Sequence, residues 1–149
     1  MIQVRVQPEA IDIAVATQGL TQGRTDVGAL VSFVGHVRAD DGLVALTLEH
    51  YPAMTERQLR AIAAEAATRW PLLGGTVIHR YGRMTPGEAI VLVAVTSAHR
   101  AAAFEAAEFL MDWLKTRAPF WKQEDRGSEQ QWVAAKASDD TAAERWQAR

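Results

Sequence analysis

Two lysines near the C-terminal end of the chain have types and a spacing that could do chemistry. Lys115 and Lys122 stand on either side of Ala118-Pro119-Phe120-Trp121, within the stretch LKTRAPFWKQE. A chain reversal near Pro119 would bring the two ammonium groups close together. Two neighbouring cations can bind a phosphate or stabilise a developing anion, and a partly desolvated lysine can act as a general base. Lys115 and Lys122 are therefore the candidate catalytic pair.

Lys115 also fits a purely structural role. A helix through this region, at about 100° per residue, has an apolar stripe made of Phe104, Ala107, Met111 and Leu114. Lys115 lies at the edge of that stripe, where its alkyl stem can cover apolar surface while its ammonium stays in water. For a single lysine this is the commoner situation, and only the presence of Lys122 directly afterwards favours a site.

Three further stretches place cations beside glycine or at a strand end: GHVR at 35–38, HRYG at 79–82 and SAHR at 97–100. The last leads from a buried strand into a helix N-terminus, where free N–H groups favour anions and where His99 and Arg100 oppose the helix dipole. The alternative, of equal weight, is that Ser97 caps the helix and both side chains are solvated.

In the first of these stretches Arg38 is the better anion-binding candidate, because His36 also fits an ordinary surface position. For His79 and Arg80 a structural or interface role is preferred over a catalytic one.

Other kinds of site lack support in the sequence. The chain has no cysteine, which excludes disulfides, thiolate metal sites and a sulfur carried on the chain itself. Its four histidines are scattered, and no phosphate-binding loop or dinucleotide fingerprint occurs, so no metal or cofactor is expected. The net charge of −2 argues against nucleic acid. No signal peptide or membrane-length apolar run is found, so a soluble cytoplasmic protein is expected.

The elements that must position these residues follow from the apolar pattern. We expect strands at 2–6, 27–37, 43–51, 77–81, 89–95, 120–124 and 131–135, and helices at 9–17, 55–70 and 98–117. The strands at 27–37 and 43–51 should form a hairpin around a turn at 40–42. The strand at 89–95 is apolar on both faces, so it should be central. These patterns predict an α+β fold, with two or more helices on a mainly antiparallel sheet.

The chain length of 149 residues suggests one catalytic domain, which we place at 1–135. Residues 136–149 are a polar tail. Thr141 and Glu144 could form a capping box for a short last helix, and disorder is the alternative.

Five stretches together resemble a known family. They are FVGHVR (33–38), LEHYPAM (48–54), VIHRYGRMTPGE (77–88), VAVTSAHRAAAFEA (93–106) and LKTRAPFWKQE (114–124). In order and spacing they are similar to the large, catalytic subunit of molybdopterin synthase, over about residues 27–133. The combination of S-x-H-R with K-x-x-x-P-x-W-K-x-E is specific. One departure lies at Lys136, where some relatives carry arginine.

The resemblance implies an α/β-hammerhead-type fold and a sulfurtransferase reaction in molybdenum cofactor biosynthesis. Cyclic pyranopterin monophosphate is converted to molybdopterin by two sulfurs from the thiocarboxylated Gly-Gly C-terminus of a small ubiquitin-like subunit. The large subunit is a homodimer within a heterotetramer. The family's basic pocket carries over to Arg38, His99, Arg100, Lys115 and Lys122. Its flanking substrate contacts carry over to His36, Val37, Gln123 and Glu124.

Helix geometry divides these residues into two groups. Arg100 and Lys115 are fifteen residues apart, so on one straight helix they are separated by about 22 Å along the axis. That is too far for both to touch one compact substrate. If both belong to one site, His99 and Arg100 come from a second copy of the chain, which gives two shared pockets per dimer.

The same hypothesis assigns roles to further residues. Glu124 would orient a lysine. The groove for the Gly-Gly tail would have walls made of Phe33, Met111, Pro119 and Phe120. Two alternatives stay open: another phosphate- or nucleotide-handling activity, and a non-catalytic dimeric binding or scaffold module whose basic anion pocket docks an acidic partner.

Overall fold

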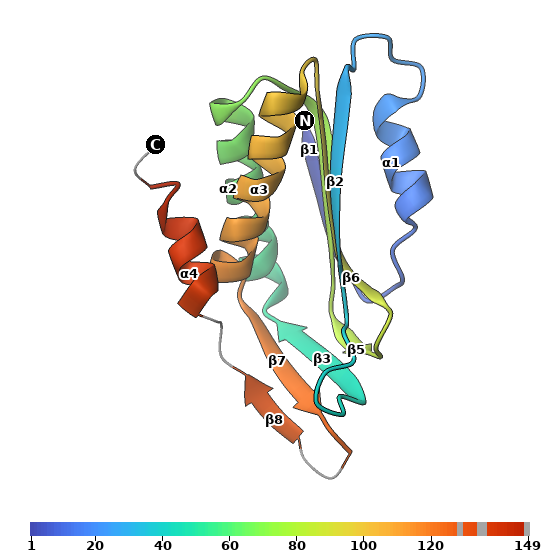
Figure 1. Ribbon diagram of the computed structural model, residues 1–149, viewed down its shortest axis with the longest axis vertical. Coiled ribbons are helices and arrows are strands. Elements are labelled where there is room, and N and C mark those ends of the chain that lie inside the picture. Colours follow the sequence, from blue (N-terminus) through green and yellow to red (C-terminus); the bar gives the residue numbers. More distant parts are fainter. Residues whose placement is uncertain (128–129, 134–136, 148–149) are drawn as a thin grey trace.

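Eight strands and four helices make up the computed structural model, which describes residues 1–127, 130–133 and 137–147 (Figure 1). The strands are β1 (Ile2–Gln7), β2 (Ala29–His36), β3 (Ala45–His50), β4 (Leu72–Arg80), β5 (Gly82–Met84), β6 (Ala89–Ser97), β7 (Phe120–Asp125) and β8 (Gln130–Val133). The helices are α1 (Ile13–Thr21), α2 (Pro52–Arg69), α3 (Arg100–Arg117) and α4 (Ala137–Glu144). No helix of the described part is long and apolar enough to cross a membrane.

The first sheet has the strand order β1-β4-β6-β2 and forms the centre of the molecule. Helices α2 and α3 cover one face and α1 covers the other (Figure 1). Successive side chains of a strand point to opposite faces, so Val91, Val93 and Val95 of β6 join the core under α2 and α3. Leu92 and Ala94 pack on the α1 side. The prediction of a central strand covered on both faces is confirmed.

The second sheet, with the order β5-β3-β7-β8, lies below the helices in Figure 1. Among the strand pairs of the described residues, only β1 with β4 is parallel. The predicted α+β class with mainly antiparallel sheets is therefore confirmed.

The predicted hairpin between 27–37 and 43–51 is wrong. β2 pairs with β6, and β3 pairs with β5 and β7 in the other sheet. The expected turn does form, since the Leu43 amide donates to the Asp40 carbonyl at 3.0 Å and Gly42 has a φ of 72°. It carries the chain from one sheet to the other instead of folding it back on itself. An apolar run specifies a strand but not which strand pairs with it.

Helix boundaries differ from the prediction where caps act. The Asp12 side chain accepts a hydrogen bond from the Val15 amide, so α1 begins at Ile13 and not at residue 9. Helix α2 begins at Pro52, because proline is well suited to a first helical position. Helix α4 begins at Ala137, so Thr141 lies inside it and the predicted capping box is wrong.

Helix α4 packs against α3. Trp146, just after α4, is buried, and its indole N–H donates to the Asp112 carboxylate at 2.6 Å. The domain boundary at 135 remains a proposal.

The buried face of α3 is rotated about the helix axis relative to the predicted apolar stripe. Phe104 is 60% exposed. The buried residues of α3 are Ala103, Ala106, Ala107, Phe109, Leu110, Trp113 and Leu114. This face is broad because α3 packs on the first sheet, on α2 and on α4 at once. Phe104 is left on the surface, one turn after Arg100.

A close backbone contact fixes the start of α3 against the start of β2. The Gly28 amide donates to the Ser97 carbonyl at 3.0 Å. A Cβ at Gly28 would lie 2.0 Å from the carbonyl oxygen of Ala98, so no other residue fits without moving the backbone. The contact holds His99 and Arg100 beside the first residue of β2.

Candidate functional site

A cavity of about 260 Å³ lies where the C-terminal end of α3 meets both sheets. We call it the lysine pocket, because Lys115 from α3 and Lys122 from β7 both line it. The other lining residues are Phe33, Gly35, His36, Leu46, Leu48, His79, Ile90, Val91, Leu114, Thr116, Ala118, Phe120 and Val133. Its volume is slightly below the roughly 300–1,000 Å³ that small-molecule sites usually have.

The chain reversal predicted near Pro119 is present and brings both lysines to one cavity. Helix α3 ends at Arg117 and β7 begins at Phe120, with the Ala118 amide still donating to the Leu114 carbonyl. Lys122 is half-buried, whereas Lys115 is exposed in the single chain. This chain alone therefore does not give Lys115 the partly desolvated environment that a general base would use.

Apolar side chains form the wall of the pocket on the β2 side. A Cβ at Gly35 would lie 2.8 Å from a methyl group of Val91, so this wall is closely packed. Of the four residues predicted as walls of the groove for the Gly-Gly tail, Phe33 and Phe120 line this pocket and Pro119 does not. Met111 packs against the main core instead.

The chemistry-bearing residue that the sequence interpretation missed here is His79. It is 6% exposed at the end of β4, its ring stacks on Phe120 with centroids 3.9 Å apart, and it lines the lysine pocket. Burial, with smaller contributions from the charges of Lys115 and Lys122, lowers its pKa to about 4. The sequence places His79 at a strand end and favours a structural or interface role for it, because Phe120, on which its ring stacks, is distant in sequence.

The buried histidine makes stability depend on pH. An unfolded histidine takes up a proton near pH 6.5, but the folded His79 does so only near pH 4. Between these values the unfolded chain binds one more proton, so acid favours unfolding. We expect His79 to lower the free energy of unfolding by about 2 kcal/mol between pH 7 and pH 5. Burial also lowers the pKa of His50, which acts in the same direction.

Urea unfolding at both pH values measures this effect, with His79→Gln as the control. The variant should lose most of the difference in the free energy of unfolding between pH 7 and pH 5. Equal differences in the variant and the native protein would contradict the prediction.

His36 lies at the end of β2 and lines the lysine pocket, but six other predicted site residues do not. Val37 is a core residue, 3% exposed, whose backbone binds Gly87 and Glu88. Arg38 points to solvent and pairs with Asp40 at 3.2 Å.

His99 and Arg100 are exposed at the N-terminus of α3, the opposite end from Lys115. The Ser97 hydroxyl donates to the His99 carbonyl. No side-chain cap bond forms at His99.

Gln123 and Glu124 lie on β7 but outside the pocket lining. Glu124 accepts a hydrogen bond from Arg126 at 2.5 Å, so an arginine engages it in place of the lysine that we expected it to orient. Lys136 lies outside the described residues.

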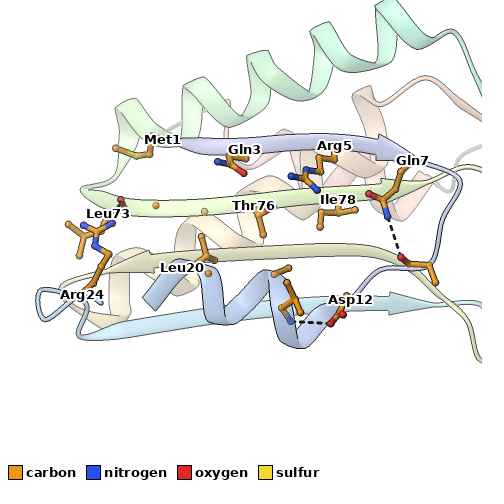
Figure 2. Close-up of a pocket in the computed structure, with 16 residues that line it drawn as sticks. Met1, Gln3, Arg5, Gln7, Asp12, Leu20, Arg24, Leu73, Thr76 and Ile78 are labelled. Atoms are coloured by element: carbon orange, nitrogen blue, oxygen red, sulfur yellow. Dashed lines mark hydrogen bonds between the residues drawn. The ribbon is translucent and has the colours of Figure 1, made fainter. Parts of the chain in front are cut away.

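A second hollow of about 480 Å³ lies between α1 and the β1 edge of the first sheet (Figure 2). It is larger than the lysine pocket but holds none of the predicted site residues. Two of its charged side chains have structural partners, since Arg24 pairs with Asp26 and Asp12 caps α1. Among the described residues, no group of three or more histidines and carboxylates could hold a metal ion.

The fold and the lysine pocket define a class of protein: an α+β domain with a small cationic cavity suited to an anion. Comparison with known proteins identifies the family. The family model for the MoaE protein matches residues 6–117. The molybdopterin synthase catalytic subunit of Mesorhizobium japonicum is 61% identical over 146 residues, which cover 96% of this chain and 92% of the relative. That of Escherichia coli is 56% identical over 126 residues, covering 83% and 84%.

Solved structures agree with this assignment. The molybdopterin biosynthesis MoaE protein of Burkholderia ambifaria aligns with a TM-score of 0.85 and 45% identity, over 99% of both chains. Molybdopterin synthase of Staphylococcus aureus aligns with a TM-score of 0.81 and 30% identity, over 90% of this chain and 98% of the other. The chain belongs to the MoaE family.

Proposed function

We infer that this chain is the catalytic subunit of a molybdopterin synthase. It is a sulfurtransferase of molybdenum cofactor biosynthesis, converting cyclic pyranopterin monophosphate to molybdopterin with sulfur from the thiocarboxylated C-terminus of a small ubiquitin-like subunit. The observation that carries the proposal is the lysine pocket, in a chain whose relatives bear this name over almost its whole length. A chain without cysteine receives its sulfur from a partner.

The two lysines act at the reacting end of the substrate in this proposal. Lys115 and Lys122 stabilise the oxyanion that forms when the thiocarboxylate carbon is attacked, and one of them transfers protons at the pterin side chain. Both line one cavity from elements joined by a short connection, which supports a common role. Arg38, His99 and Arg100 hold the phosphate and the pterin, with His36, Val37, Gln123 and Glu124 flanking them.

Each pocket is completed by a second copy of the chain. Lys115 and Arg100 stand at opposite ends of α3, about 22 Å apart along its axis. The half-open pocket and the exposed Lys115 leave room for a second molecule. Phe104, exposed one turn after Arg100, gives that end of α3 an apolar contact surface.

The free edge of the first sheet offers a route to this arrangement. β2 is the last strand of the sheet, and Phe33 in its middle is 42% exposed. Antiparallel pairing of two β2 strands would place the His36 end of one beside the Ala29 end of the other. Because Gly28 holds the start of α3, Arg100 of the second copy would then approach the lysine pocket.

Reconstitution tests the function directly. The chain is incubated with cyclic pyranopterin monophosphate and a small partner bearing a C-terminal Gly-Gly thiocarboxylate, and molybdopterin is measured as its fluorescent oxidation product. We expect product only when both are present. Product without the thiocarboxylate, or none with it, would contradict the proposal. We place the enzyme in the cytoplasm, as its sequence suggests.

A further inference from the structure

His79 is a buried titratable residue that the roles above leave unused. It belongs to β4 of the first sheet, whereas Lys122 belongs to the second sheet, and the lysine pocket lies between them. Four lining residues of the pocket can carry a proton close to the substrate: Lys115, Lys122, His36 and His79. The question is what His79 contributes beside two cations.

Hydrogen bonding fixes which ring nitrogen carries the proton. His79 Nδ1 lies 2.8 Å from the Arg80 carbonyl oxygen. A carbonyl only accepts, so Nδ1 donates and the neutral ring keeps its lone pair on Nε2. Burial keeps the ring neutral, since its pKa is lowered to about 4. At neutral pH the histidine thus supplies an acceptor and no third positive charge.

Packing fixes the orientation of the ring. It stacks on Phe120 at an interplanar angle of 16°, and the ring of His50 packs on the same Phe120 at 5.6 Å. Phe120 lies two residues before Lys122 on β7, so the ring is held beside one lysine by its neighbour in the chain. The positive charges of both lysines lower the pKa of the ring.

We propose that His79 is a positioning residue of the sulfur-transfer reaction, whose Nε2 accepts a hydrogen bond from a lysine ammonium of the pocket. The acceptor holds that ammonium at the reacting end, where a flexible four-carbon side chain alone would sample many positions. A third cation there would repel the pair, whereas a neutral acceptor does not. The inference rests on the proposed function and adds a residue to it.

Two variants separate the two ring nitrogens. His79→Asn keeps an N–H near the position of Nδ1, for the Arg80 carbonyl, and removes the group at Nε2. His79→Gln does the reverse and places an amide near Nε2. With the thiocarboxylated partner, we expect His79→Asn to lower kcat about tenfold or more with KM changed less than about threefold. His79→Gln should keep most of kcat. A structural role through Arg80 predicts the opposite order.

A second measurement needs no variant of His79. Nitrogen-15 NMR of the native complex at neutral pH should show a proton on Nδ1 alone, and the Nε2 signal should move in Lys122→Ala or Lys115→Ala. A protonated Nε2, a signal unmoved by either lysine variant, or a kcat loss in His79→Gln as large as in His79→Asn would overturn the inference. Failure of the function itself is distinguished because the native complex would then make no molybdopterin.

Discussion

Replacing Lys115 by alanine is expected to lower the rate of molybdopterin formation by about 100-fold or more, the range lost with a general acid–base or oxyanion-stabilising group. Lys115 lines the lysine pocket, and its side chain is exposed in the single chain, so its removal should leave the fold intact. The rate is measured as product formed from cyclic pyranopterin monophosphate with the thiocarboxylated partner.

Arg117→Ala is the matched control for this experiment. Arg117 is also a cation in the last turn of α3, but it lies over the Trp113 ring at 4.0 Å and outside the pocket lining. Its removal should change the rate less than about twofold. Complex formation with the partner should survive in both variants. If Lys115→Ala turned over at the native rate, the catalytic role would be wrong. If it abolished assembly, a binding or scaffold module would be the better description.

A heterodimer of Lys115→Ala with Arg100→Ala is expected to recover about half of the native rate, although each variant alone is strongly impaired. If α3 of one copy reaches the pocket of the other, such a heterodimer has one pocket with both residues intact and one pocket that lacks both. Two different affinity tags allow the heterodimer to be isolated, and its rate is compared with those of the two homodimers.

The control is a heterodimer in which each chain carries a substitution of a different lysine. Lys115 and Lys122 line the same pocket from the same chain, so a heterodimer of Lys115→Ala with Lys122→Ala has one lysine missing from each pocket. It should stay as impaired as its parents. Shared pockets would be refuted if the heterodimer carrying Arg100→Ala were no more active than this control.

The positions of helices and strands could be predicted better than which strands pair with each other. The apolar run at 89–95 revealed a central strand, because burial on both faces leaves no polar alternation. The pairing of 27–37 with 43–51 was wrong, because the turn at 40–42 is real but leads into another sheet. The face of α3 was misjudged at Phe104, since the surroundings of α3 decide which side is buried.

The site could be predicted where it is local in sequence. The segment containing Lys115, Pro119 and Lys122 is short, and the chain reversal predicted within it is enough to bring both lysines to one cavity. The role of His79 could not be found in this way, because it depends on Phe120, which follows it by about forty residues, and on the C-terminal end of α3. Glu124 was assigned to a lysine, but Arg126, two residues further on, engages it.

The connection between α3 and β7 consists of two residues, Ala118 and Pro119. The conformational entropy lost on closing a loop grows with its length, and proline restricts the backbone further, so little freedom remains to be lost here. Once the helix and the strand have formed, local structure sets the separation of the two backbone positions from which the lysine side chains extend. The two cations are thus brought to one cavity before any ligand arrives, and binding energy is not needed to bring their backbones together.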